Sequence, residues 1–161
     1  MGEIKKVGIA ELDVCSSPDA ITTLGLGSCV GVAIYDPVMK IGGLVHVMLP
    51  DSTAVKNNTN IAKFADTGIR ELLKLLEKKG INRARLKAKI AGGAQMFAFN
   101  TTNDAMRVGD RNVEASKRTL QQLRIPIVAE DTGKNYGRTV IFYPENGDFV
   151  IKAVGKPVKT I

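Results

Sequence analysis

Two residue types in this chain can support nucleophilic attack on an amide. The 161 residues include two cysteines, Cys15 and Cys29, and a single histidine, His46. An unperturbed thiol has a pKa of about 8.5 and is only a few per cent ionised at neutral pH. A neighbouring imidazole removes the thiol proton, holds the thiolate as an ion pair, and then protonates the departing amine or ammonia. A cysteine paired with His46 would therefore make a cysteine-dependent amidohydrolase.

A predicted β-hairpin brings one of the cysteines to the histidine. The turn signal Asp36–Met39 separates two runs with strand character. If these four residues form the loop, Tyr35 pairs with Lys40, and counting back places Cys29 opposite His46. Directly opposed residues share a face, with Cβ atoms about 4.5–5.5 Å apart. A change of register by one residue would separate the pair, so the prediction depends on the loop.

Residues just before Cys29 provide the other parts of such a site. Thr23 lies six residues earlier on the preceding predicted strand and is a candidate hydrogen-bond partner that fixes the histidine tautomer. Gly25, Gly27 and Ser28 permit a tight, exposed backbone before the nucleophile. We expect N–H groups of this segment to help stabilise an oxyanion.

Each candidate also has a purely structural interpretation. A cysteine in an apolar strand is usually a buried thiol, and a histidine between two valines is more often a satisfied core residue. Cys15 lacks a basic partner of this kind and keeps the structural interpretation. The glycine pair in Ala91–Ala94 matches neither nucleotide-binding pattern, so a tight turn is expected. Adjacent residues of a strand point to opposite faces, so Glu130 and Asp131 should not share a site.

Composition limits the other classes of function. The length suits one domain spanning residues 1–161. Two cysteines and one histidine are too few for a structural zinc site, and no metal or cofactor is expected. The net charge of +7 comes with 5% aromatic residues and no tryptophan, which does not favour nucleic-acid binding, although a basic face can steer an acidic protein partner. The chain lacks a signal peptide and a run of about 20 apolar residues, so we expect a cytoplasmic protein without membrane insertion.

The pattern of elements that must position these residues is α+β. Apolar residues recur at helical spacing in residues 61–79, and a second helix is predicted for Arg111–Leu123. Strict alternation over Arg85–Ala91 predicts a half-exposed strand. Asn146-Gly147 predicts a hairpin near the C-terminus. Many strands, mostly in hairpins, together with two substantial helices, predict an α+β domain.

The motifs of the chain resemble those of the CheD family of chemoreceptor glutamine deamidases. The resemblance rests on residues 22–30 (TTLGLGSCV) with His46 seventeen residues after the cysteine, and it continues through residues 91–97 (AGGAQMF), 109–112 (GDRN) and 129–133 (AEDTG). These blocks follow the order of the family and cover nearly the whole chain. One departure is Lys134, where the family often has a second glycine, so the conformation of that turn is left open.

The resemblance implies a fold, an activity and partners. It implies a layered α/β/β/α sandwich with mixed, largely antiparallel sheets and a catalytic triad, whose roles fall on Cys29, His46 and Thr23. It implies a protein-glutamine glutaminase that converts glutamine side chains of methyl-accepting chemotaxis receptors to glutamate, with release of ammonia. It also implies binding to the CheC phosphatase. In this complex CheC inhibits deamidation, and the CheD protein stimulates the phosphatase.

Two other interpretations stay open from the sequence. One is a binding module that acts on receptors or CheC by contact alone. A Cys29→Ala protein that still restores the chemotactic response would favour it. The other is a general cysteine protease, but the chain is short for two lobes, and Cys29 and His46 lie far closer in sequence than in papain-like enzymes.

Overall fold

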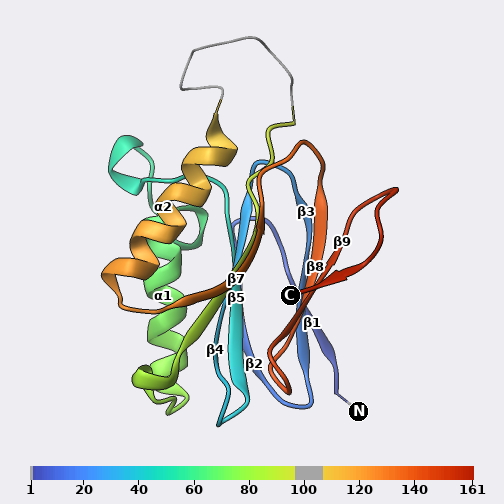
Figure 1. Cartoon of the computed structure of the whole chain (residues 1–161). Helices are drawn as coiled ribbons and strands as arrows, with labels where there is room; N and C mark the ends of the chain where they lie inside the picture. Colours follow the sequence, from blue (N-terminus) through green and yellow to red (C-terminus); the bar gives the residue numbers. More distant parts are fainter. Residues whose placement is uncertain (1, 97–106) are drawn as a thin grey trace.

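The computed structural model describes residues 2–96 and 107–161. In these residues the chain forms two mixed five-stranded sheets and two α-helices (Figure 1). The first sheet has the order β1 (Ile4–Val7), β3 (Ala20–Leu26), β8 (Arg138–Tyr143), β9 (Asp148–Lys152) and β10 (Lys159–Thr160). The second has the order β2 (Leu12–Ser16), β5 (Ile41–Val47), β4 (Val30–Asp36), β6 (Lys87–Gly92) and β7 (Ile127–Thr132). The predicted α+β class is confirmed.

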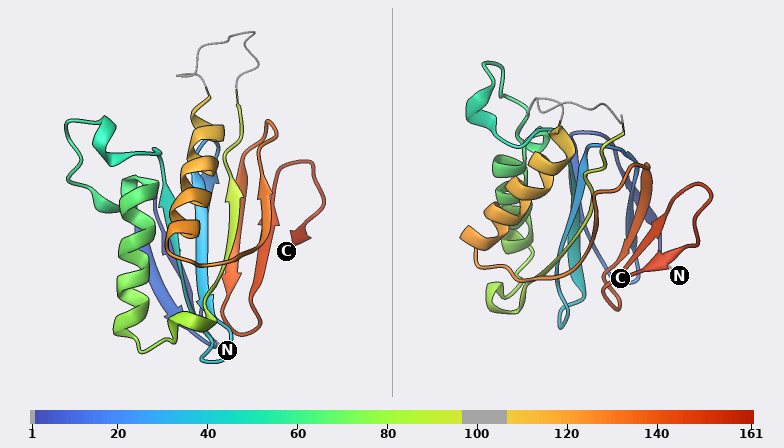
Figure 2. Two further views of the ribbon diagram at one scale, coloured as in Figure 1. Left: turned by 60° about the vertical axis from the view of Figure 1, so that its left-hand side comes forward. Right: turned by 45° about the horizontal axis from the view of Figure 1, so that its top comes forward.

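Both helices lie on the same face of the second sheet (Figures 1 and 2). They are α1 (Ala65–Lys78) and α2 (Val108–Gln122), and they pack against each other and against the central strands. The first sheet covers the opposite face, which gives the layer order helices, sheet, sheet. The described residues place no helix on the outer face of the first sheet, so the second helical layer of the expected α/β/β/α sandwich is absent from them. The physical reason is that α1 and α2 both bury their apolar faces in one core.

The helical layer differs from the prediction at one boundary. The expected helix over residues 61–79 is interrupted at Phe64. The backbone of Phe64 is extended and forms a parallel β-bridge with Leu49, and its side chain is buried. A short 3₁₀ turn, Ile61–Lys63, precedes Phe64, and α1 begins only at Ala65. Apolar residues of α1 then pack onto the second sheet as the periodicity predicts.

The prediction of a half-exposed strand after α1 is wrong. In β6 every residue after Lys87 is buried, including Lys89. The Lys89 side chain is covered because it lies on the face of the second sheet that packs against the first sheet. Its ammonium donates hydrogen bonds to the carbonyl oxygens of Gly147 (2.6 Å) and Ile161 (2.8 Å), which satisfies the buried charge. The alternation of apolar and charged residues in this segment therefore does not reflect its burial, because the strand is covered on both faces.

Two apolar cores result from this layering. One lies between the helices and the second sheet, and the other lies between the two sheets. Strand β4 is buried along its whole length because it has β5 and β6 at its sides and a packed layer on each face. The start of β4 follows directly on Cys29, so this rigid strand fixes one side of the candidate site.

Candidate active site

The candidate nucleophile lies where strands of the two sheets are joined. Cys29 ends the short connection between β3 of the first sheet and β4 of the second. Its side chain is half-buried and packs against the core between the two sheets. Cys29 therefore stands between the layers, where a group from either sheet can approach it.

The hairpin that carries Cys29 and His46 has a different register from the predicted one. Asp36 pairs with Ile41, so the four-residue loop begins one position later than predicted, and His46 pairs with Gly31. The shift moves the partner of His46 by two residues and so preserves the face. Cys29 lies two residues before Gly31, in the bend just outside β4, and its side chain packs against the core between the sheets, the face toward which alternation also directs His46. The predicted pairing was wrong in detail, while the shared face remains.

His46 is bound to the third predicted residue. The Nδ1 atom of His46 lies 2.8 Å from the Thr23 hydroxyl oxygen, and both side chains are fully buried. The same hydroxyl donates its only proton to the Val7 carbonyl oxygen at 2.7 Å. The hydroxyl must therefore accept the second bond, so the proton of the neutral imidazole is on Nδ1. This network leaves the lone pair of Nε2 free to act as a base.

Burial keeps this imidazole neutral. Desolvation lowers the pKa of His46 from 6.5 to about 4. Nε2 is buried and has no hydrogen-bond partner among the described residues. A buried polar atom without a partner is uncommon in a stable core and often marks a functional position.

Burial also keeps the Cys29 thiol protonated. Desolvation raises the pKa of Cys29, and a hydrogen bond from its own backbone N–H only partly offsets this. The expected thiolate–imidazolium ion pair is therefore not the state favoured at rest, because burial disfavours the charged form of both groups. Both groups are neutral at rest, and no hydrogen bond joins the Cys29 sulfur to Nε2, so proton transfer is left to the encounter with substrate.

The glycine segment at the end of β6, residues 92–94, holds the backbone around Cys29. The carbonyl oxygens of Gly27 and Cys29 accept hydrogen bonds from the N–H groups of Ala94 and Gly93, each at 2.8 Å. At Gly92, where φ is +107°, an added Cβ would lie 2.4 Å from the Cys29 carbonyl oxygen. The tight turn expected at Ala91–Ala94 is not found, because β6 continues to Gly92 and residues 93–96 form neither a turn nor a bend. The positive φ values of Gly92 and Gly93 instead allow the close approach to the nucleophile loop.

These contacts decide which N–H groups remain available for an oxyanion. The N–H of Gly27 donates to the Gly25 carbonyl oxygen at 3.1 Å and is therefore engaged. The N–H groups of Ser28 and Cys29 make no backbone hydrogen bond to another described residue. Of Gly27 and Ser28, the two N–H groups expected from the sequence, only that of Ser28 has no backbone partner among the described residues, and the Cys29 N–H, which contacts its own sulfur, is the next candidate.

The second cysteine stays apart from this site. Cys15 is buried in β2, and desolvation raises its pKa to about 11. Its sulfur donates a long 3.9 Å hydrogen bond to the Asp19 carbonyl oxygen. The structure therefore supports the structural interpretation of Cys15.

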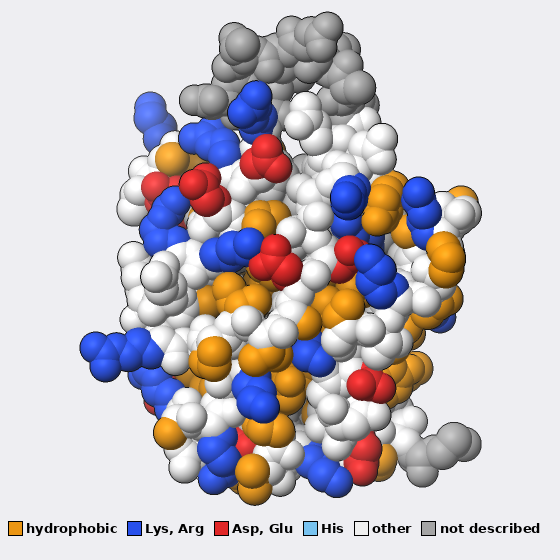
Figure 3. Space-filling model, in the orientation of Figure 1, with side chains coloured by type: hydrophobic (Ala, Val, Ile, Leu, Met, Phe, Trp, Pro, Cys, Tyr) orange, Lys and Arg blue, Asp and Glu red, His pale blue; other side chains and the backbone are white. Residues whose placement is uncertain are grey.

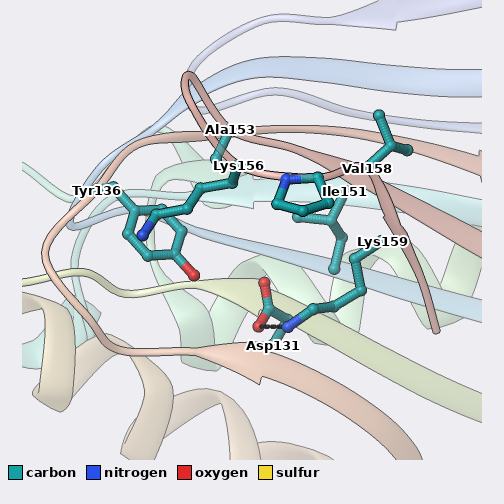
Figure 4. A pocket seen from close by; sticks show the side chains of 8 residues that line it. Asp131, Tyr136, Ile151, Ala153, Lys156, Val158 and Lys159 are labelled. Atoms are coloured by element: carbon teal, nitrogen blue, oxygen red, sulfur yellow. Dashed lines mark hydrogen bonds and ion pairs between the residues drawn. The ribbon is translucent and has the colours of Figure 1, made fainter.

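Glu130 and Asp131 do not share a site. The Glu130 carboxylate pairs with Lys117 of α2, whereas Asp131 pairs with Arg138 and Lys159 of the first sheet. Asp131 lines a pocket of about 290 Å³ together with Tyr136 and residues of the C-terminal strands (Figure 4). The three candidate catalytic residues do not line this pocket. Within residues 2–96 and 107–161, no three metal-ligating side chains cluster.

On the face shown in Figure 3, lysine and arginine side chains are interspersed with acidic and apolar ones. The described part of the chain has no helix long and apolar enough to cross a membrane.

Comparison with known proteins places the chain in a family. The family model described as CheD chemotactic sensory transduction matches residues 48–153. A relative from Lachnoclostridium phytofermentans, named probable chemoreceptor glutamine deamidase CheD, is 65% identical over 161 residues that make up 100% of both chains. The chain belongs to the CheD family. The resemblance inferred from the motifs is thereby confirmed.

Other relatives and one solved structure are similar to the chain. The chemoreceptor glutamine deamidase CheD of Halalkalibacterium halodurans is 52% identical over 162 residues and covers 100% of both chains. A probable chemoreceptor glutamine deamidase CheD from Caldanaerobacter subterraneus is 53% identical over 99% of this chain and 98% of its own. The hypothetical protein YfiH of Bacillus licheniformis covers 72% of this chain and 47% of its own, with a TM-score of 0.45 and 18% identity.

The structure also reveals positions that the sequence did not single out as parts of a site. Lys134 has φ of +65°, so a residue with a Cβ stands here in the left-handed region that favours glycine. Asn112 of α2 is fully buried and contacts the carbonyl of Ser28. The block GDRN was recognised only as a family motif, and its contact with the nucleophile loop required the fold. Phe97 of the block AGGAQMF lies outside the described residues.

Proposed function

We propose that this protein hydrolyses glutamine side-chain amides of chemoreceptors to glutamate and ammonia, with Cys29 as the nucleophile. The observation that carries the proposal is the Thr23–His46 hydrogen bond, which leaves Nε2 as an unpartnered base on the face shared with Cys29. The names of the full-length relatives support the substrate class. Chemistry and similarity thus support the same reaction.

The proposed reaction has two steps that balance. In the first, His46 Nε2 takes the Cys29 thiol proton while the sulfur attacks the glutamine carboxamide carbon. The imidazolium then gives the proton to the departing amino group. Ammonia is released, and the glutamine acyl group remains bound to Cys29 as a thioester. In the second, His46 takes a proton from water, the hydroxide attacks the thioester, and the proton returns to the Cys29 sulfur as glutamate is released.

Thr23 and the loop backbone support these steps. Thr23 orients the ring and accepts from Nδ1–H, so it stabilises the imidazolium that forms after proton transfer. The N–H groups of Ser28 and Cys29 are proposed to bind the oxyanion of the tetrahedral intermediate, with Gly27 shaping the turn before them. Burial strengthens these interactions, since the surroundings of His46 exclude water.

A direct assay tests the proposed reaction. The protein is mixed with a glutamine-bearing chemoreceptor fragment, and released ammonia is measured together with the mass change of the fragment. We expect stoichiometric ammonia and the mass shift of an amide becoming an acid, and no reaction with Cys29→Ala. Cys15→Ala is the matched control, because it removes the other thiol and should leave activity intact. Full activity in Cys29→Ala would refute the mechanism.

The CheC phosphatase is the partner that family membership leads us to propose, with the cytoplasm as the place of action. Purified CheC should co-elute with the protein in size-exclusion chromatography and slow deamidation of the receptor fragment. If Cys29→Ala still restores chemotaxis in cells, the alternative of a binding module is favoured over catalysis. Failure of CheC to bind would remove this partner without affecting the proposed reaction.

A further inference from the structure

Asn112 occupies an unusual position beneath the candidate site. Its side chain is fully buried in α2, and its amide nitrogen donates to the carbonyl oxygens of Ser28 and Met48, both at 2.9 Å. Ser28 immediately precedes the nucleophile, and Met48 lies two residues after His46. We propose that Asn112 is a positioning residue that holds the Cys29 loop against the strand carrying His46, an inference that rests on the proposed function.

The orientation of the Asn112 amide is determined by its partners. Both partners are carbonyl oxygens, which only accept, so the nitrogen and not the oxygen must face them. The two hydrogens of one NH₂ group are thus used on two different chain segments. The Asn112 oxygen has no partner among the described residues. A side chain retained only for packing would not require this donor pattern.

The bridge stands where the sheet itself no longer joins the two segments. The ladder between β4 and β5 ends at the pair Val30–Val47, so Cys29 and Met48 lie beyond the last backbone pairing. The chain after Val47 turns away, with the Met48 N–H donating to the Lys63 carbonyl oxygen at 2.8 Å. A side-chain bridge from α2 therefore replaces the missing ladder at the point where Cys29 and His46 must keep their separation.

Close packing fixes the helix that carries Asn112. An added Cβ at Gly109 would lie 2.5 Å from the Ala94 carbonyl oxygen, so α2 rests directly on the glycine segment. That segment donates hydrogen bonds to the carbonyl oxygens of Gly27 and Cys29. With Asn112 on Ser28, three consecutive carbonyls of the nucleophile loop are held by α2 and the glycine segment on which it rests. Small displacements of this frame would move the sulfur relative to Nε2.

The test compares Asn112→Asp with Ser116→Ala. Aspartate has the shape of asparagine but, when ionised, no donor for the two carbonyls. Ser116 is buried one turn later in α2, and its hydroxyl has no partner among the described residues, so it reports on helix packing alone. Asn112→Ala is the second variant and serves if a buried carboxylate prevents folding. All three are first compared with the parent protein by thermal unfolding.

Two readouts separate positioning from simple destabilisation. With the receptor fragment, we expect kcat to fall about 100-fold in the Asn112 variants while KM changes little, since a misplacement near 1 Å costs a factor of that size. We also expect the pH midpoint of Cys29 alkylation by iodoacetamide to move down toward that of a free thiol, because a released loop exposes the sulfur. Ser116→Ala should leave both readouts unchanged.

The alkylation profile also separates this inference from the proposed function. If the receptor fragment is not deamidated by the parent protein, the proposed function fails, but the alkylation midpoint still reports whether Asn112 holds the loop. Folded Asn112 variants with the kcat and alkylation profile of Ser116→Ala would overturn the positioning role. A lowered midpoint in both Asn112 variants, with a lowered kcat where turnover occurs, would support it.

Discussion

Replacing Thr23 with valine tests the histidine network most sharply. The substitution keeps the branched shape and removes the hydroxyl that accepts from His46 and donates to the Val7 carbonyl oxygen. Both bonds are buried, so valine leaves a donor and an acceptor without partners. Without the acceptor, the ring proton is no longer held on Nδ1, and the tautomer with the proton on Nε2 cannot act as the base.

The size of both effects follows from these contacts. An unpaired buried polar group costs about 1–3 kcal/mol, so two of them should lower the free energy of unfolding by about 2–5 kcal/mol. General-base catalysis contributes about 10²–10⁴-fold to rates of this kind. Since the imidazole can still visit the productive tautomer, we expect kcat of Thr23→Val to fall by about 100-fold.

Thr22→Val is the matched control for this prediction. Thr22 is the adjacent residue of β3 and loses one hydrogen bond, to the Val140 carbonyl oxygen at 2.7 Å, without touching His46. It should cost about 1 kcal/mol of stability and leave kcat unchanged. Thr23→Ser keeps the hydroxyl and should recover most of the activity.

The assay is ammonia release from the receptor fragment, measured beside urea unfolding of each variant. If Thr23→Val is folded and keeps the kcat of the parent protein, the assigned role of the Thr23–His46 bond is wrong. Equal losses in Thr22→Val and Thr23→Val would also contradict it, because they would reflect stability rather than the imidazole.

Three further predictions concern pH, thiol reactivity and stability. His46 must be neutral to accept a proton, and burial lowers its pKa to about 4. The value of kcat/KM should therefore stay constant down to about pH 5 and halve near pH 4, whereas a loss centred near pH 6.5 would indicate that the ring is not buried. Cys29 should react with iodoacetamide faster than Cys15, whose pKa is raised to about 11, as measured by peptide mass at pH 8; the reverse order would exclude Cys29 as the nucleophile. Asp36 accepts hydrogen bonds from Arg85 and from the backbone of the hairpin loop, so Asp36→Ala should lower the free energy of unfolding by about 3 kcal/mol. Urea titration measures this, and an unchanged unfolding midpoint would refute it.

The acid sensitivity of folding follows from the same groups. The pKa of Asp36 is held well below its usual range because Arg85 and nearby N–H groups bind the carboxylate more than burial disfavours it. This contribution is present above the unfolded pKa of about 3.9 and is lost as pH falls through the lower folded pKa. The contribution of neutral His46 is lost earlier, between about pH 6.5 and pH 4.

Local sequence patterns predicted the elements that depend on local chemistry. The hairpin predicted at Asn146-Gly147 is found between β8 and β9, because its turn residues mark it in the local sequence. The strand Leu12–Ser16 was missed, since its pairing with β5 is a long-range contact that leaves little local signal. Burial of Lys89 was missed for the same reason, because the covering sheet comes from distant segments.

The site shows the same division between local and distant information. Residue types and a turn of the expected length were enough to bring Cys29 and His46 to one face, although the loop begins one residue later than predicted. The tautomer of His46 depends on Val7, whose carbonyl oxygen accepts the Thr23 proton. Val7 belongs to β1, and no local sequence pattern connects β1 to Thr23. The bridge from Asn112 depends on the position of α2 on the glycine segment after β6, which no local pattern indicates.

The central claim is that Cys29 forms a covalent intermediate with a receptor glutamine. Its most direct test is intact-protein mass spectrometry after acid quenching of a reaction with the receptor fragment. We predict a species with the summed mass of the two chains less one ammonia, with the modified peptide containing Cys29. Cys15→Ala should form it and Cys29→Ala should not. Deamidation by Cys29→Ala, or an adduct on any other residue, would contradict the account.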